Sequence, residues 1–97
     1  MDEPDAVIGK FLLNSHIALI LFDTGASHSF ISRSFVNKHG LAVENIGNPI
    51  RVSSPGGEMI VSSGCRQLNL EIGKHQFPTD LIVLETQGLD VIIAWIG

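Results

Sequence analysis

The pattern of apolar and polar residues along the chain predicts short strands rather than long helices. Residues 67–72 alternate between apolar and polar side chains, which is typical of a strand with one buried face. Residues 17–22 are consecutively apolar, which predicts a strand covered on both faces. Taken together, the pattern predicts about seven strands, over residues 7–13, 16–22, 50–53, 59–62, 67–72, 79–84 and 91–93. Short strands at this spacing are typical of a β barrel or a β sandwich.

One segment, residues 30–39, has the spacing of a short helix. Ile31, Phe35 and Val36 fall on one face of such a helix. Gly40 follows it directly, and glycine is the residue that most often ends a helix. We therefore expect a single helix between the strands.

Composition and charge narrow the class of protein. The 97 residues have the length of one domain, 44% are hydrophobic and only 16% are charged, a balance that excludes a disordered tail. The longest apolar runs have six residues, whereas a membrane-spanning helix needs about 20. The net charge is −4 and the basic residues are scattered, so nucleic acid and anionic membranes are poor candidates for partners. We expect a single domain over residues 1–97 that binds neither.

The single cysteine, Cys65, bears on the cellular compartment and on metal binding. It excludes an intramolecular disulfide and the zinc motifs that need a Cys-x-x-Cys pair. The histidines show no metal-binding spacing such as His-Glu-x-x-His. The acidic N-terminus has no apolar run of the kind that forms a signal peptide. We expect no metal, no cofactor and a cytoplasmic location.

The chemically informative segment is the triplet Asp23-Thr24-Gly25, which directly follows an apolar strand. The backbone of Asp23 should therefore lie inside the fold, and a buried carboxylate is costly unless it is hydrogen bonded. Thr24 can supply a hydrogen bond, and Gly25 allows another backbone to approach closely. Taken alone, the triplet is also consistent with a turn whose aspartate caps the loop or the next helix.

In its surroundings, the triplet resembles the catalytic loop of aspartic proteases. More closely, nearly the whole chain resembles the retropepsin-like protease domain of plant gypsy-type LTR retrotransposon polyproteins. The segments that carry the resemblance are Val7-Ile8-Gly9, Leu21-Phe22-Asp23-Thr24-Gly25-Ala26-Ser27-His28-Ser29-Phe30-Ile31-Ser32, Phe35-Val36, Gly40-Leu41, Ser54-Pro55-Gly56-Gly57-Glu58, Cys65, Phe77-Pro78, Asp80-Leu81-Ile82-Val83-Leu84 and Asp90-Val91-Ile92-Ile93. The resemblance implies an all-β, retropepsin-like (acid protease) closed barrel with one short helix, which works as a homodimer.

The resemblance also implies the chemistry of Asp23. Two facing aspartates share one proton; one takes a proton from a water molecule, and the other protonates the peptide carbonyl oxygen. The chain contains one Asp-[Thr/Ser]-Gly motif, since Asp90 is followed by Val91 and Ile92. A two-lobed enzyme within one chain is therefore excluded, and a symmetric dimer must contribute Asp23 twice.

The residues after Asp23 receive roles from the same resemblance. Thr24 is expected to join a hydrogen-bond network across the dimer, and Gly25 to line the substrate cleft with its backbone. Ala26 is expected to pack beneath the aspartates, and Ser27 to hydrogen bond to the loop or to the substrate.

Between two predicted strands, the segment Ser54-Pro55-Gly56-Gly57-Glu58 has the composition of a hairpin tip. The resemblance identifies it as the flap that folds over the substrate, with Pro55, Gly56 and Gly57 in contact with the substrate. An ordinary hairpin turn is the alternative.

The other polar and aromatic residues suggest structural roles. Cys65 is expected to be a small buried hydrophobe, and His28 to lie at the surface or at the start of the helix. Trp95 is expected to pack in the core or at an interface. A Ser-His-Asp triad has no support, because no Gly-x-Ser-x-Gly motif occurs.

The chain departs from the family pattern after the last predicted strand. Ala94 stands where the family has a glycine, and Trp95, Ile96 and Gly97 replace most of the short helix that follows there. We expect either a C-terminally shortened domain or a decayed copy, and both would weaken dimerisation.

The leading interpretation is an aspartic endopeptidase that cleaves a polyprotein bound in extended conformation. The first alternative is an inactive retropepsin-fold domain that serves as an interaction or dimerisation module, or survives as a relic. A ligand-binding β barrel, monomeric and with a filled interior, is the second alternative, which the triplet at Asp23 disfavours.

Overall fold

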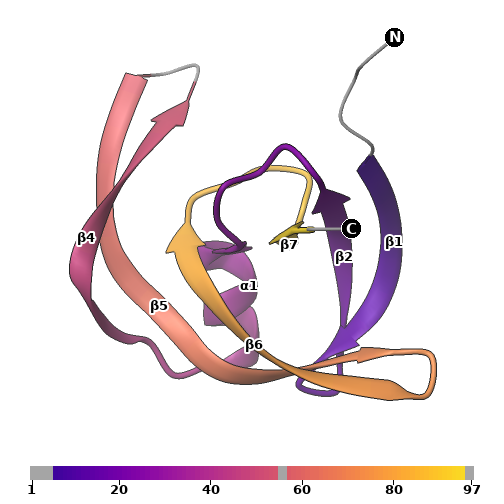
Figure 1. Ribbon diagram of the computed structural model, residues 1–97. Helices are drawn as coiled ribbons and strands as arrows, with labels where there is room; N and C mark the ends of the chain where they lie inside the picture. Colours follow the sequence, from indigo (N-terminus) through magenta and orange to yellow (C-terminus); the bar gives the residue numbers. More distant parts are fainter. Residues whose placement is uncertain (1–5, 55–56, 96–97) are drawn as a thin grey trace, which may run out of the picture.

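The computed structural model describes residues 6–54 and 57–95, which form seven strands and one short helix (Figure 1). The elements are β1 (Ala6–Leu13), β2 (His16–Asp23), β3 (Phe30–Ser32), α1 (Arg33–His39), β4 (Glu44–Ser54), β5 (Gly57–Ile72), β6 (His75–Leu84) and β7 (Val91–Ala94). The expected all-β class with one short helix is therefore confirmed.

The strands belong to one sheet with the order β1-β2-β7-β3-β6-β5-β4. Leu12 and Leu13 of β1 also pair with β5, opposite Glu71 and Leu70. The pairing thus returns to its starting strand, and within residues 6–54 and 57–95 β4 pairs only with β5, which leaves it with a free edge. In Figure 1 the β4–β5 hairpin rises on one side and β1 with β2 on the other, with the loop after β2 between them.

The helix predicted over residues 30–39 begins three residues late. Phe30, Ile31 and Ser32 form a buried strand that pairs with β6 and β7. The Ser32 hydroxyl accepts a hydrogen bond from the Phe35 N–H at 3.1 Å, so Ser32 is the N-cap of α1. The prediction failed because Ile31 of β3 packs on the same core as Phe35 and Val36 of α1. The three apolar residues therefore have the spacing of one helical face, although Ile31 belongs to a strand. The C-terminal stop at Gly40 is confirmed, since this residue adopts the left-handed conformation with φ of 62°.

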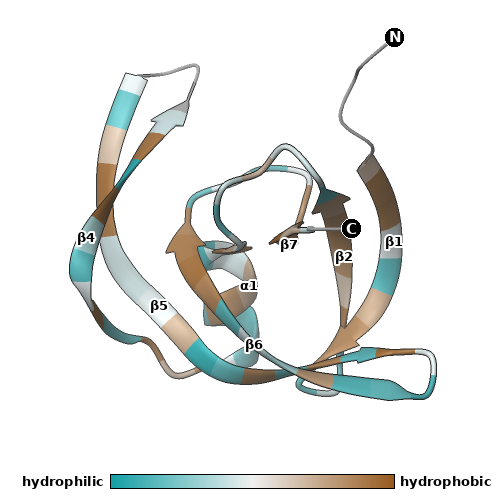
Figure 2. Cartoon of the chain, viewed as in Figure 1, coloured by the Kyte–Doolittle hydropathy of each residue, from teal (hydrophilic) through white to brown (hydrophobic). Residues whose placement is uncertain are grey.

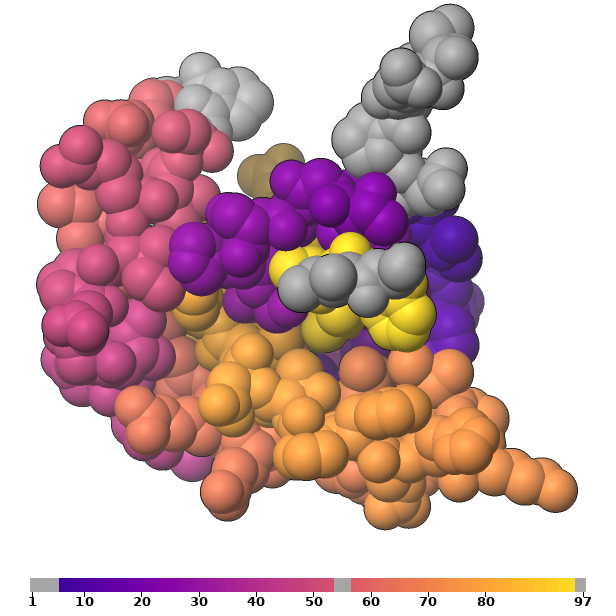
Figure 3. Space-filling model, in the orientation of Figure 1, coloured from indigo at the N-terminus to yellow at the C-terminus, as the bar shows by residue number. Residues whose placement is uncertain are grey.

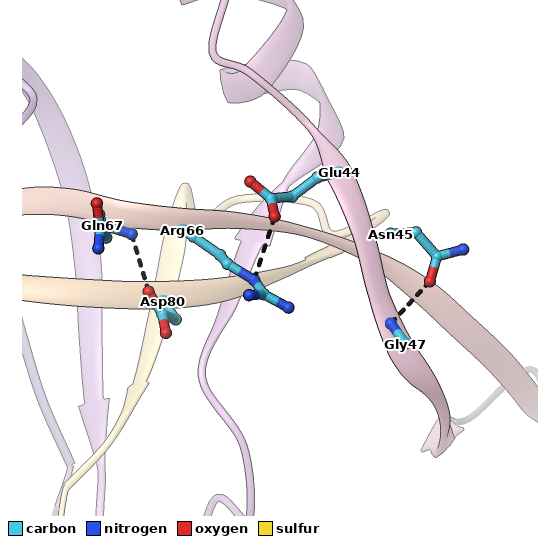
Figure 4. A network of polar contacts seen from close by, with 6 residues as sticks. All are labelled: Glu44, Asn45, Gly47, Arg66, Gln67 and Asp80. Atoms are coloured by element: carbon cyan, nitrogen blue, oxygen red, sulfur yellow. Dashed lines mark hydrogen bonds and ion pairs between the residues drawn. The ribbon is translucent and has the colours of Figure 1, made fainter.

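The two strands predicted over 59–62 and 67–72 are one long strand, β5. A bulge between Cys65 and Leu68 interrupts its pairing with β6, and Gln67 adopts a positive φ of 56° there. The Asp80 carboxylate accepts a hydrogen bond from the Gln67 N–H at 2.8 Å, which compensates for the lost strand pairing (Figure 4). The prediction of two separate strands is therefore wrong.

The apolar run 17–22 is not covered on both faces along its whole length. Ala18 and Ile20 are completely buried, whereas Ile17 is 68% exposed. The expectation is therefore wrong at the start of β2, where the strand leaves the turn from β1.

A single core fills the space inside the curved sheet. Figure 2 shows apolar residues concentrated on β2 and on the part of β6 nearest the loops. The buried cluster comprises Leu13, Ala18, Ile20, Ile31, Phe35, Val36, Cys65, Leu68, Leu70, Leu81, Val83, Val91 and Ile93. Burial, with a smaller contribution from Glu44, raises the pKa of the Cys65 thiol, which fits a packing role for this residue.

A pair of stacked imidazoles joins α1 to the start of β2. The rings of His39 and His16 lie 4.0 Å apart, and Phe35 contacts the His39 ring on the helix side. Partial burial, then His16 and Lys38, lower the pKa of His39 from its ordinary 6.5, against an opposing effect of Asp90. The folded state therefore binds a proton less readily at His39 than the unfolded state does.

We expect the free energy of unfolding to fall as the pH drops from 7.5 to 5.5. The contribution of His39 is fully present above pH 6.5 and is lost as the pH falls towards its lowered pKa. Urea unfolding midpoints at several pH values measure this fall, which should be smaller in His39→Gln. His75→Gln, at the exposed start of β6, is the control that should retain it. An equal slope in His39→Gln would contradict the prediction.

Candidate active site

Asp23 is the last residue of β2, held between its two neighbouring strands. It pairs with Ala6 of β1 and with Ala94 of β7. Its backbone carbonyl accepts hydrogen bonds from the Trp95 N–H at 3.1 Å and from the Ala26 N–H at 3.4 Å. The pairing of β2 with β1 and β7 thus holds Asp23 in a fixed position at the end of the sheet.

The Asp23 carboxylate is oriented by the loop that follows it. Its Oδ1 accepts a hydrogen bond from the Gly25 N–H at 2.8 Å. Such a bond fixes the orientation of the carboxylate relative to the loop. The side chain is half-buried, so it combines a fixed position with access from solvent.

Ser29 anchors the far end of the loop, a role that the sequence analysis missed. Its hydroxyl accepts a hydrogen bond from the Ala94 N–H at 2.9 Å, and its carbonyl accepts one from the Ile82 N–H at 3.0 Å. Ser29 therefore joins the loop to both β7 and β6. No local pattern could have found it, because its partners lie more than 50 residues away along the chain.

Asp90 has a structural role at the start of β7, the end of that strand away from Asp23. Its Oδ2 accepts a hydrogen bond from the Leu19 N–H at 2.8 Å, and its own N–H donates to the Leu19 carbonyl. Asp90 thus fixes the start of β7 against β2, consistent with its exclusion as a second catalytic motif.

The loop after Asp23 faces the β4–β5 hairpin across a cavity of about 340 Å³. One wall consists of residues 25–28 with Phe30, and the other consists of Arg51, Val52 and Ser53 of β4. In Figure 3 a recess opens between the loop and the hairpin at the upper end of the molecule. A second cavity of about 430 Å³ shares His28 and extends along the inside of β4, past Ile46 and Ile50, to Asp80 and Ile82.

The structure brings together part of the predicted site. Gly25, Ala26 and Ser27 line the cavity, directly after Asp23 and Thr24. Gly57 opens β5 at the hairpin end, with φ of 121°, and is not among the cavity residues. Pro55 and Gly56 lie outside the described residues.

The opposite wall and His28 are what the sequence analysis missed. The alternation of residues 50–53 could have indicated Val52, but nothing local indicates Arg51. His28 lines both cavities and lies five residues before α1, so of its two expected positions, the surface and the helix start, the helix start is wrong. The Ser27 hydroxyl and His28 Nδ1 are 3.0 Å apart, within hydrogen-bond distance.

Ala94 and Trp95, the residues at which the chain departs from the family pattern, both hydrogen bond to residues of the Asp23 loop at the end of the sheet. Ala94 continues β7 and pairs with Asp23, and its N–H anchors Ser29. Trp95 packs edge-on against Phe22, with ring centroids 5.7 Å apart, and is still 50% exposed. Trp95 is therefore a surface residue near the candidate site rather than a core residue.

Among the described residues, no group of three or more His, Cys, Asp or Glu side chains could hold a metal ion. Within the same residues, no helix is long and apolar enough to cross a membrane.

A curved sheet with one short helix and an Asp-Thr-Gly loop facing a hairpin defines the class of retropepsin-like aspartic proteases. The family model described as retroviral aspartyl protease matches residues 1–96, and the chain belongs to this family. None of the curated proteins compared with the chain matches it.

Two solved structures illustrate the shared fold. EIAV protease complexed with the inhibitor HBY-793 has a TM-score of 0.70 and 18% identity, over 92% of this chain and 81% of that chain. The retroviral protease-like domain of Ddi1 from Leishmania major has a TM-score of 0.65 and 17% identity, over 94% of this chain and 73% of that chain. The expectation of an aspartic protease fold is thereby confirmed.

Proposed function

We propose that the chain is an aspartic endopeptidase that acts as a symmetric homodimer, with Asp23 of each subunit forming one catalytic pair. The observation that carries the proposal is the Asp23 carboxylate, held by the Gly25 N–H beside a cavity that the β4–β5 hairpin borders. The chain has one such motif, so a second carboxylate must come from a second copy. Family membership supports the same chemistry.

The proposed mechanism needs the two Asp23 carboxyl groups to share one proton. Two carboxylates about 3 Å apart cannot both be ionised, so the pair titrates as a unit. The ionised member takes a proton from a water molecule, whose oxygen attacks the peptide carbonyl carbon. The protonated member donates its proton to the carbonyl oxygen, and a tetrahedral intermediate forms. No metal or cofactor enters these steps.

The neighbouring residues receive supporting roles. Thr24 hydrogen bonds across the dimer, Gly25 orients the carboxylate and borders the cleft, and Ala26 packs beneath the pair. Ser27 contacts the loop or the substrate. On the other side, we assign Pro55, Gly56 and Gly57 to a flap over the substrate, because β4 and β5 lead directly to this tip.

The proposed substrate is a polyprotein segment in extended conformation. The free edge of β4 runs along the cavity and offers backbone groups to such a strand. We further propose a closed barrel, supported by the pairing of β1 with β5, and a single domain over residues 1–97. An origin in a plant gypsy-type retrotransposon and a cytoplasmic location stay predictions, as does the absence of nucleic-acid and membrane partners.

Exposed apolar residues near Asp23 support self-association. Val7, Ile8 and Trp95 are 61%, 59% and 50% exposed, although all three are large and apolar. The strand pairing places them close to Asp23, because Val7 and Ile8 lie opposite Phe22 and Leu21 of β2. A second copy would cover this surface and bring the two Asp23 loops together.

The proposal is tested by cleavage of an unstructured polypeptide at about pH 5 over a hundredfold range of protein concentration. If monomers pair to form the site, activity per chain rises with concentration and levels off where sedimentation shows dimers. Dimers that cleave nothing would overturn the protease proposal in favour of the inactive dimerisation module. If activity per chain is constant and sedimentation shows only monomers, the proposal that two subunits share one active site is overturned.

A further inference from the structure

We propose that the cleft selects substrates with an acidic side chain, which binds between Arg51 on β4 and His28 on the loop. This inference rests on the proposed function and adds the chemical class of residue that the substrate must carry. It follows from the charge of the cavity walls, the position of β4 and the partners of the side chains.

The 340 Å³ cavity has a positive wall in a negatively charged protein. The net charge of the chain is −4, yet among the described residues that line this cavity only Arg51 and His28 have ionisable side chains. On the hairpin, the Glu58 carboxylate belongs to the residue opposite Ser53 in the β4–β5 pairing, and Glu58 is not among the residues that line the cavity. Asp23 is not among the residues that line this cavity, and its carboxylate is assigned to the proposed catalytic pair.

Arg51 is at the edge where an extended substrate would lie. Among the strands that the structure describes, β4 pairs only with β5, so its other edge is open. Three consecutive residues of β4, Arg51, Val52 and Ser53, line the cavity, so the cavity follows this edge rather than one face of the strand. A side chain of a bound strand would therefore pass close to Arg51.

The guanidinium of Arg51 has no partner among the described residues. It is exposed and forms neither an ion pair nor a hydrogen bond with them. Arg66, which lines the neighbouring cavity, differs in this respect, because its Nε lies 3.3 Å from Glu44 (Figure 4). Arg51 is thus available for the two parallel N–H bonds with which a guanidinium binds a carboxylate.

His28 completes the site from the opposite wall. When the Ser27 hydroxyl donates to His28 Nδ1, the ring hydrogen is on Nε2, which can then donate to a ligand. A carboxylate between Arg51 and His28 would meet donors on both sides. The amide of a glutamine has the same shape but accepts with one oxygen and lacks the negative charge, so it would bind these donors less well. A lysine side chain would be repelled by Arg51.

The test uses pairs of peptides that differ in one residue. The cleavage site is first mapped in an unstructured polypeptide, and peptides that span it are made with Glu or Gln at each flanking position. We expect kcat/KM to favour Glu over Gln about fivefold at one position, the size of an exposed charge pair. Arg51→Gln should reduce this ratio to about one, and Arg51→Glu should favour Lys over Gln at the same position. Lys74→Gln, in the exposed turn after β5, is the matched control that should keep the Glu preference.

The outcomes separate this inference from the proposed function. Since each ratio compares two peptides with one enzyme, a loss of stability in a variant changes both values alike. Cleavage without a Glu preference, or with one that persists in Arg51→Gln, overturns the inference and leaves the protease intact. If no peptide is cleaved by a dimeric protein, the proposed function fails and this inference fails with it.

Discussion

The Asp23→Asn protein is expected to fold normally and to lose peptide cleavage, with kcat/KM lower by about a thousandfold or more. An amide has the shape of the carboxyl group, and its oxygen can still accept the hydrogen bond from the Gly25 N–H. It cannot take a proton from water or carry the shared proton. In a symmetric dimer the substitution removes both catalytic carboxyl groups at once.

Cleavage of an unstructured polypeptide, with thermal unfolding measured in parallel, checks this prediction. Glu71→Gln is the matched control, because it makes the same change of carboxylate to amide near the end of β5, next to the turn into β6. It should cleave like the unmodified protein. Comparable cleavage by Asp23→Asn would remove Asp23 from the mechanism, whereas a large drop in its melting temperature would assign the loss to unfolding.

The sequence was sufficient for the parts of the site that depend on local pattern. The apolar run 17–22 predicted a strand that Asp23 directly follows, and in the structure Asp23 is the last residue of that strand, β2. The Gly25 N–H that donates to the Asp23 carboxylate belongs to the same triplet, two residues along the chain. These features were predictable since strand, carboxylate and glycine are neighbours along the chain.

The features that the sequence did not predict depend on distant contacts. Ile31 and Ser32 form a strand only because β6 and β7 flank them, and β5 continues through its bulge because Asp80 binds Gln67. The wall formed by Arg51 is opposite the Asp23 loop only because β4 folds back on β5. Tertiary pairing decided each case, and no local preference reveals it.

Mixing the unmodified protein with Asp23→Asn is expected to lower cleavage more steeply than dilution does. If subunits pair at random, only dimers of two unmodified chains keep both carboxyl groups, so activity follows the square of their fraction. At a ninefold excess of Asp23→Asn, with total protein constant, about 1% of the activity should remain. Independent monomers would keep about 10%, in proportion to the unmodified chains.

The two proteins are unfolded and refolded together so that the subunits exchange, and initial cleavage rates are measured across the series of fractions. A matched series with Glu71→Gln in place of Asp23→Asn should show constant activity, because every pair then keeps both Asp23 groups. A straight line in the Asp23→Asn series would mean that each chain acts alone, and the shared site would be wrong even if Asp23 is essential. A quadratic curve beside a constant control shows that activity requires Asp23 from both subunits, which no property of the separate chains can imitate.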